Sequence, residues 1–156
     1  MVEPLRGKRY TVIGIAVVII GTILVIGFVV TLSHQIAQPI EQHKENIVNG
    51  LITVQNLNHQ VYSFSAPSGS SSAKVEGRFE VSDGRAIRVV VLDQDGYTNY
   101  KNRHQFNYYF VSGEQTVGDI STDIPVGTTM YLVYDNNNSI LTDKDVRTTV
   151  DLLYVR

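Results

Sequence analysis

The chain has 156 residues, a formal net charge of −2 and no cysteine. Without cysteine, a disulfide framework, a thiolate metal site and a cysteine nucleophile are all excluded. Residues 33–156 contain ten basic and fourteen acidic side chains, and this mildly acidic balance argues against nucleic-acid binding. The length beyond residue 32 is sufficient for one domain with a single core.

Residues 10–32 form an uncharged apolar segment, YTVIGIAVVIIGTILVIGFVVTL. A helix needs about 20 such residues to cross a hydrocarbon core, so the segment predicts one transmembrane helix. Arg6, Lys8 and Arg9 precede it, and the positive-inside rule then places residues 1–9 in the cytoplasm and the rest outside the cell membrane. The run is longer than a signal-peptide core and no small-residue cleavage site follows it. We therefore expect an uncleaved, single-pass signal anchor whose first partner is the lipid bilayer.

Gly14 and Gly21 lie seven residues apart within this segment and therefore share one face of the predicted helix. Two interpretations are open. Glycine is common in membrane helices, and small residues on one face also allow close packing against a neighbouring helix of another membrane protein.

Residues 33–50 are mostly polar and contain Pro39, which predicts a stalk. From residue 51 the pattern changes to alternation of apolar and polar residues, with turn residues about every ten positions. This pattern is typical of an all-β fold, and we predict an antiparallel, jelly-roll-like β-sandwich of about eight strands over residues 51–156. The predicted strands cover 51–57, 60–66, 73–81, 86–92, 106–111, 116–124, 130–134 and 146–155.

Two of these strands have informative patterns. Val75, Phe79 and Val81 alternate with charged residues, which predicts a half-buried strand. Residues 89–92 are apolar on both faces, which predicts a central strand whose outer side is covered by a loop, the stalk or a partner. No helical periodicity is found outside the predicted membrane segment, so no further helix is expected.

The phrases VEGRFEVSDGRAIRVVVLDQDGYTNY, YYFVSGEQTVGDI, IPVGTTMYLVYDNNNS and VRTTVDLLYVR follow one another within residues 75–156. Their order and turn placement resemble the small β-sandwich domains related to the GOLD (emp24/p24-type) fold of membrane-anchored proteins. Here the membrane helix precedes the domain instead of following it. The resemblance implies a non-enzymatic module that binds proteins or lipids at a membrane.

Asp93, Asp95 and Asn99 surround Gly96 in the sequence LDQDGYTN. Oxygen ligands that alternate around a glycine are found at the start of calcium-binding loops. A complete EF-hand loop would need a glutamate at the position of His104. A weak calcium site is therefore one interpretation, and an ordinary Asp-Gly turn between two strands is the other.

Residues 135–139 read DNNNS and predict a turn, because Asn and Asp tolerate left-handed backbone angles. Asn137 also fits the N-x-S acceptor pattern for glycosylation on an exterior loop. The four histidines form no closely spaced pair. A metal site that joins His59 and His104 is one alternative, and surface or partner-contact histidines are the other.

Six aromatic residues lie between positions 97 and 110. Tyrosines make rigid, amphipathic contact surfaces, and we consider Tyr97, Tyr100 and Tyr109 as candidates for an interaction patch. Alternation along the predicted strand sends neighbouring rings to opposite faces, so packing in the core is an equally open interpretation.

Hydrolase, P-loop and dinucleotide-binding motifs are missing from the sequence. The favoured hypothesis is a non-catalytic, membrane-anchored extracytoplasmic binding or accessory module, such as a small subunit of a larger membrane complex, without a cofactor. The alternatives are a calcium- or ligand-binding sensor domain and an anchored hydrolase whose catalytic residues are dispersed in the sequence.

Overall fold

The computed structural model describes residues 40–156. The predicted cytoplasmic tail, the predicted transmembrane helix and its Gly14 and Gly21 lie outside the described residues. Within the described part, no helix has the length and apolar character that a membrane crossing requires.

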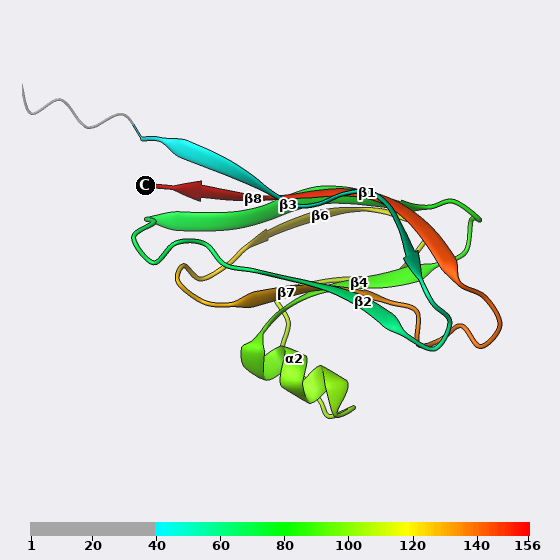
Figure 1. The fold of residues 1–156 in the computed structure, drawn as a ribbon. Coiled ribbons are helices and arrows are strands. Elements are labelled where there is room, and N and C mark those ends of the chain that lie inside the picture. The colour runs from blue at the N-terminus through cyan, green and yellow to red at the C-terminus, as the bar shows by residue number, and fades with distance from the viewer. Residues whose placement is uncertain (1–39) are drawn as a thin grey trace, which may run out of the picture. The chain divides into compact units, whose positions relative to one another are not determined.

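Eight strands and one helix make up the described domain (Figure 1). In chain order they are β1 Gln42–Val54, β2 His59–Phe64, β3 Ser72–Val81, β4 Ile87–Asp93, α2 Gln94–Lys101, β5 Phe110–Gln115, β6 Val117–Asp123, β7 Met130–Asp135 and β8 Lys144–Val155.

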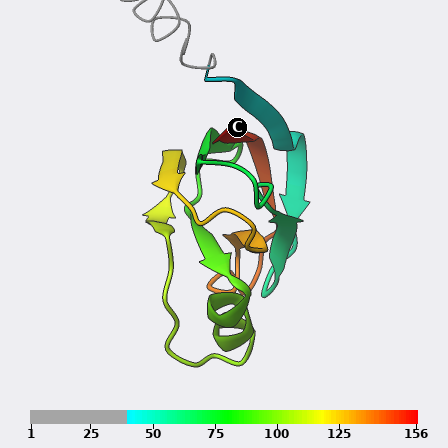
Figure 2. The ribbon, with the colours of Figure 1, turned by 90° about the vertical axis from the view of Figure 1, so that its left-hand side faces the viewer.

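The strands form two four-stranded antiparallel sheets that face one another (Figure 2). The first sheet has the order β1-β8-β3-β6, and the second has the order β2-β7-β4-β5. Because the two sheets exchange strands along the chain in this way, the arrangement is that of a jelly roll. The predicted all-β, antiparallel sandwich of eight strands is confirmed.

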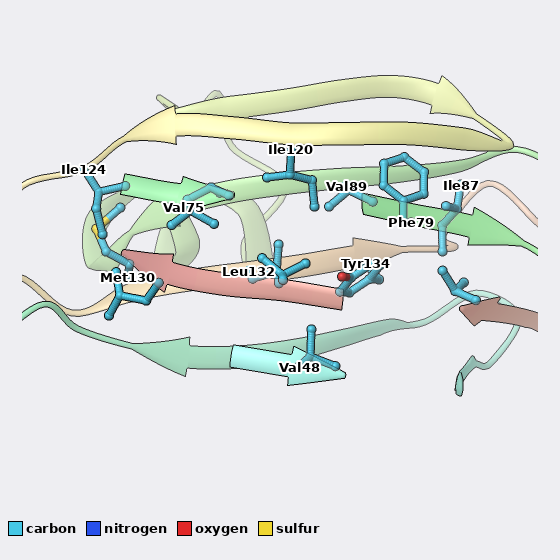
Figure 3. Close-up of a cluster of buried hydrophobic side chains, with 14 of the residues drawn as sticks. Val48, Val75, Phe79, Ile87, Val89, Ile120, Ile124, Met130, Leu132 and Tyr134 are labelled. Carbon is cyan, nitrogen blue, oxygen red and sulfur yellow. The ribbon is translucent and has the colours of Figure 1, made fainter. Parts of the chain in front are cut away.

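The core fills the space between the two sheets (Figure 3). Val75 and Phe79 of β3 point into it and are fully buried, and Val81 is almost fully buried, so the predicted apolar face of this strand is confirmed. The alternating residues of β8 from Val146 to Tyr154 are buried as well. Apolar side chains at every second position of β3 and β8 thus supply the wall of the core that the first sheet forms.

The first strand differs from the prediction, because β1 begins at Gln42, within the segment 33–50 that was assigned to a stalk. It pairs with β8 along its whole length, from Gln42 with Val155 to Val54 with Lys144. A bulge at Ile47 interrupts the alternation of apolar and polar residues. The first part of β1 is therefore a strand whose polar sequence, interrupted by a bulge, shows no strand pattern. Backbone pairing with β8 stabilises it.

The fifth strand also differs, because β5 covers Phe110–Gln115 and not 106–111. Ser112 and Gly113 fall between two of the predicted strands but lie inside β5, where β5 has one residue more than its partner β4. Gly113 has a φ of 68°, a left-handed conformation that glycine adopts without steric cost. The glycine forms a β-bulge here.

The helix α2 contradicts the expectation that the described domain contains only strands. It follows β4 directly and covers the outer face of the second sheet (Figure 1). β4 is a central strand, as predicted, and α2 together with the segment that follows it is the cover on its outer side. The helix is eight residues long, too short for a sequence period to stand out from turn residues.

Candidate functional site

The outer face of the second sheet carries a row of ionisable residues at one end. His59 of β2 pairs with Asp135 of β7, Asp135 pairs with Arg88 of β4, and Arg88 pairs with Glu114 of β5. Because residues in register across a sheet point to the same face, these four side chains from four strands lie side by side.

The next rows of the same face are apolar. Val133 lies between Val61 and Val90 in the following row, and these valines pack against the aromatic rings of α2. Tyr97 stacks on Tyr131 with 4.4 Å between the ring centroids. The apolar rows therefore hold α2 against the sheet and fix its last turn beside the ionisable row.

Both ends of α2 have defined caps. The carboxylate of Asp93 accepts a hydrogen bond of 2.7 Å from the backbone N–H of Gly96, which makes Asp93 the N-cap. At the other end, the N–H of His104 donates to the carbonyl of Asn99, and the N–H of Arg103 donates to that of Tyr100. These two bonds form a Schellman motif.

A cleft of about 690 Å³ opens between the last turn of α2 and the beginning of β2. Its volume is within the usual range for small-molecule sites, roughly 300–1,000 Å³. Two other hollows of the described domain are smaller, about 220 and 320 Å³. The cleft is lined by Leu57, Asn58, His59, Arg88, Tyr100, Lys101, Arg103, His104, Phe106 and Asn137.

Two residues of the cleft have a strained backbone. Leu57 and Arg103 have φ angles of 53° and 57°, and they are the only non-glycine residues with a positive φ within residues 40–156. For side chains of this size a left-handed conformation costs about 1–2 kcal/mol, and such strain tends to gather at functional sites. At Arg103 the strain places a cationic side chain at the Schellman position where glycine is usual.

The rim on the other side of the cleft is built by two loops that are joined by hydrogen bonds. The N–H of Leu57 donates to the carbonyl of Ser139. Asn136 is buried, and its Nδ2 lies 3.0–3.2 Å from the carbonyl oxygens of Val54, Gln55 and Thr142. Asn136 therefore fastens the β1–β2 turn to the β7–β8 loop and sets the position of this rim.

Arg88, which lines the cleft, forms an ion pair with the buried Asp135. The Nε and Nη2 atoms of Arg88 both donate to Oδ2 of Asp135, with a distance of 3.0 Å for Nε. The other oxygen, Oδ1, accepts from the backbone N–H and the side-chain amide of Asn137 at 2.9 and 2.6 Å. Burial lowers the pKa of Arg88, but the pairing with Asp135 outweighs this effect and the pKa is raised.

Tyr100 connects the helix to this ion pair. Its hydroxyl accepts a hydrogen bond of 3.0 Å from Nδ2 of Asn137, and its ring meets that of His59 edge-on at 5.3 Å. Burial, and then the negative charge of Asp135, raise the pKa of Tyr100 well above its usual value. The phenol is therefore neutral at physiological pH and adds no charge to the cleft.

The residues predicted for calcium lie in and before α2. Asp93 caps the helix, while Asp95 and Asn99 belong to its first and second halves. The expected Asp-Gly turn between two strands is thus wrong, because the segment is helical. Within residues 40–156, no group of three or more His, Asp or Glu side chains is arranged to hold a metal ion. The calcium site stays a prediction.

The three candidate tyrosines have different surroundings. Tyr100 is 7% exposed and belongs to the cluster beneath α2, Tyr97 is half-buried in the same cluster, and Tyr109 is 41% exposed. The predicted turn over residues 135–139 is confirmed. Asn137 is exposed as a residue, but its side-chain amide donates two hydrogen bonds, and its glycosylation stays a prediction.

His59 and His104 line the same cleft, although they are 45 positions apart in the sequence. Sequence analysis did not single out three cations of the cleft, Arg88, Lys101 and Arg103, and it noticed Asp135 only as part of the loop 135–139. One signal was available: Arg88 and Asp135 are charged residues within or directly after strongly apolar strands, and buried charges are usually paired. The left-handed Arg103 has no such signal, because the helix that it terminates was not expected.

No family model matches the chain, and no curated protein matches it. Similar solved structures include the Bacillus endospore appendages, described as disulfide-linked pili, at 11% identity and a TM-score of 0.44 over 74% of this chain and 88% of that one. They also include the Aeromonas hydrophila periplasmic lysozyme inhibitor PliG, at 10% identity and a TM-score of 0.42 over 77% and 90% of the two chains.

A third is the CBM36-1 domain of a xylanase from the hindgut metagenome of Trinervitermes trinervoides, at 10% identity and a TM-score of 0.43 over 72% and 96% of the two chains. None of the three is described as a GOLD or emp24 protein, and the GOLD-like relationship stays a prediction. Similarity this low assigns no function, so the role of the cleft has to be argued from its own geometry.

Proposed function

We propose that this chain is a membrane-anchored, extracytoplasmic binding module, and that the cleft between α2 and β2 is its binding site. The observation that carries the proposal is the cleft itself. It is concave and of ligand size, and its walls combine cationic, amide and aromatic side chains. Leu57 and Arg103, the two non-glycine residues with left-handed backbones within the described part of the chain, both line it.

The position of the cleft within the domain supports a binding role. The domain begins beside its own C-terminus, where the N–H of Arg156 donates to the carbonyl of Glu41. From there β1 runs for 13 residues to the turn that forms the rim of the cleft, a distance of about 40 Å at the usual rise of a strand. The cleft, which Leu57, Asn58 and His59 line after this turn, is thus at the end of β1 remote from Gln42; Figure 1 shows the course of β1.

The anchoring part of the proposal depends on residues 10–32, whose sequence predicts a transmembrane helix. Protease added to intact cells that express the full chain should remove residues 40–156, and alkaline washing should leave the chain in the membrane fraction. Protection of the domain in intact cells, or its release by the wash, would contradict the proposed placement.

The binding part is tested by affinity purification of the full chain from a mild detergent extract of its native membranes. In the test variant, Lys101→Glu and Arg103→Glu reverse two charges of the cleft. In the matched control, Arg147→Glu reverses an exposed charge on β8, in the other sheet. We expect partners or ligands recovered with the wild-type chain and the control to be lost with the test variant.

Equal recovery with all three chains would mean that binding does not use the cleft. Recovery of the wild-type chain alone, with neither protein nor small-molecule companion, would contradict a binding role. A thermal melt of each variant accompanies the purification, so that a loss of binding is not mistaken for a loss of folding.

A further inference from the structure

The cleft concentrates positive charge on a domain that is acidic as a whole. Residues 40–156 contain ten Lys and Arg side chains and fourteen Asp and Glu side chains. Arg88, Lys101 and Arg103 line the cleft together with His59 and His104, whereas no carboxylate lines it. Three of the ten permanent cations thus face one cavity.

These cations are available to a ligand to different extents. Lys101 and Arg103 are exposed and form no ion pair with a described carboxylate. The ammonium group of Lys101 lies 4.7 Å from the ring centre of Tyr97, a contact that restrains the side chain without neutralising its charge.

Asp135 fixes the position of Arg88, but part of the guanidinium group has no hydrogen-bond acceptor within residues 40–156. The side chain of its partner Asp135 is 2% exposed, while a third of the Arg88 side chain is exposed. Asp135 accepts from Nε and Nη2, and Nη1 donates no hydrogen bond to any residue within 40–156. One edge of a planar, oriented guanidinium group therefore remains for an acceptor, and guanidinium groups match carboxylates and phosphates best.

Two carboxylates lie near this arginine without lining the cleft. Both oxygens of Asp135 accept hydrogen bonds from Arg88 and Asn137, as described above. Glu114 follows Arg88 in the row across the sheet, and its Oε1 accepts from the amide of Asn138 at 2.8 Å. Asp135 thus has partners for both of its oxygens, whereas Glu114 is exposed and accepts one hydrogen bond. The side-chain donors of Lys101 and Arg103 and the Nη1 group of Arg88 have no acceptor within residues 40–156.

We propose that the cleft binds a small organic anion that carries more than one carboxylate or phosphate group, with Arg88 as the anchor and Lys101 and Arg103 as the outer contacts. The proposal deepens the proposed function and uses the same cleft. Tyr100 and Phe106 supply the apolar part of the wall, and the cavity of about 690 Å³ suits a ligand of metabolite size more than a flat protein surface.

The test is isothermal titration of the full chain in detergent micelles at constant ionic strength. The probes are citrate, glucose 6-phosphate and, as the uncharged match of the latter, glucose. We expect citrate or glucose 6-phosphate to bind and glucose not to bind. Binding of glucose with the same affinity as glucose 6-phosphate, or no binding of either anion, would overturn the proposal.

Variants locate the binding. Lys101→Gln with Arg103→Gln removes the outer charges from exposed positions and should weaken anion binding about tenfold or more, because charge-assisted hydrogen bonds to the ligand are lost. Arg147→Gln is the matched control and should bind like the wild type. Arg88→Gln should abolish binding, but it leaves Asp135 without its partner, so the exposed double variant decides the outcome if this one does not fold.

The result is separable from that of the purification experiment. Anions that bind equally to the wild type and the Lys101/Arg103 variant would overturn the anion proposal, even if protein partners still depended on the cleft. Binding of an acidic peptide to the wild type but not to the Lys101/Arg103 variant, without binding of citrate or glucose 6-phosphate, would also overturn the anion proposal. In that case the ligand of the binding module would be a protein. Anion binding without any cleft-dependent partner would support a small-molecule site.

Discussion

The hydroxyl groups of Tyr134 and Thr148 are hydrogen-bonded to each other at 2.6 Å across the core of the sandwich. Tyr134 belongs to β7 in one sheet and Thr148 to β8 in the other, and both are buried. Thr148 uses its hydrogen for the carbonyl of Arg78 at 3.1 Å, so Tyr134 is the donor to Thr148. This chain of two bonds joins both sheets through an otherwise apolar interior.

Removing one partner of this bond should destabilise the domain. Thr148→Val leaves the buried hydroxyl of Tyr134 without an acceptor, and we expect a loss of about 2 kcal/mol in the free energy of unfolding. Tyr134→Phe removes the donor and should cost about 1 kcal/mol. The double variant should lose less than the sum, because no unpaired hydroxyl is left. Thermal melts followed by the near-ultraviolet circular dichroism of the tyrosines measure all three.

Thr149→Val is the matched control, since Thr149 is the exposed neighbour and bonds only to Asn49 on the surface. It should change the stability by less than about 0.5 kcal/mol. Strict additivity of the two core substitutions would show that the bond between the sheets contributes nothing of its own.

The domain should lose stability in alkali. Burial raises the pKa of Tyr134 and of Tyr100 above the usual value near 10. A raised pKa in the folded state means that the stabilisation is complete below pH 10 and is lost as the pH rises above 10, because the unfolded chain gives up these protons first. Each such group should contribute a slope of about 1.4 kcal/mol per pH unit.

Melting temperatures between about pH 9 and 12, together with the ultraviolet absorbance of tyrosinate, check this expectation. Tyr134→Phe should make the slope shallower. An unchanged slope would mean that Tyr134 ionises in the folded protein as it does in the unfolded one.

Gly77 should not tolerate a side chain. It lies in β3, and a Cβ atom there would come within 2.4 Å of the carbonyl oxygen of Thr149 and 2.7 Å of the Cα of Val150. These are backbone atoms of β8 and cannot rotate away, so Gly77→Ala should cost about 3 kcal/mol or prevent folding. The control is Gly69→Ala, where nothing lies within 4 Å. Similar melting temperatures for both variants would contradict the tight packing of β3 on β8.

Asp93 offers a test that separates a helix cap from a calcium ligand. Asp93→Ala removes the cap and should destabilise the domain by about 1 kcal/mol, whereas Asp93→Asn keeps a capping oxygen and should cost little. If Asp93, Asp95 and Asn99 bound calcium, the ion would raise the melting temperature of the wild type and not that of Asp93→Asn. We expect Asp93→Ala to lower the melting temperature and calcium to leave the melting temperatures unchanged. A calcium-dependent rise in the melting temperature of the wild type alone would show that these residues also bind calcium.

The parts of the fold that sequence analysis predicted are those in which local pattern and packing agree. β3 and β8 alternate strictly because one face of each is buried, so their bounds were found within one or two residues. β1 was missed up to residue 50 because Ile47 sits in a bulge and the strand is polar. Its stability comes from pairing with β8, about 100 positions away in the sequence. A local sequence pattern cannot indicate such a distant pairing.

The candidate site was predicted even less completely, because it is assembled from four segments of the chain. Asn137 was considered for glycosylation, His59 and His104 as the ligands of one metal site, and Tyr100 as part of an aromatic patch, but these three ideas were not connected. What brings them together is the register of β2, β7 and β4 and the end of α2 at Arg103. Register between strands is a property of the folded sheet, so His59, Asp135 and Arg88 could not be placed in one row beforehand.

The pairing of β1 with β8 has a consequence for engineering the protein. Because Glu41 and Arg156 are hydrogen-bonded neighbours, a short linker could join them, and the exposed turn at Asp83 and Gly84 could be opened to give new chain ends. Such a circular permutant would keep every strand pair and the cleft. It would contain the domain without residues 1–39.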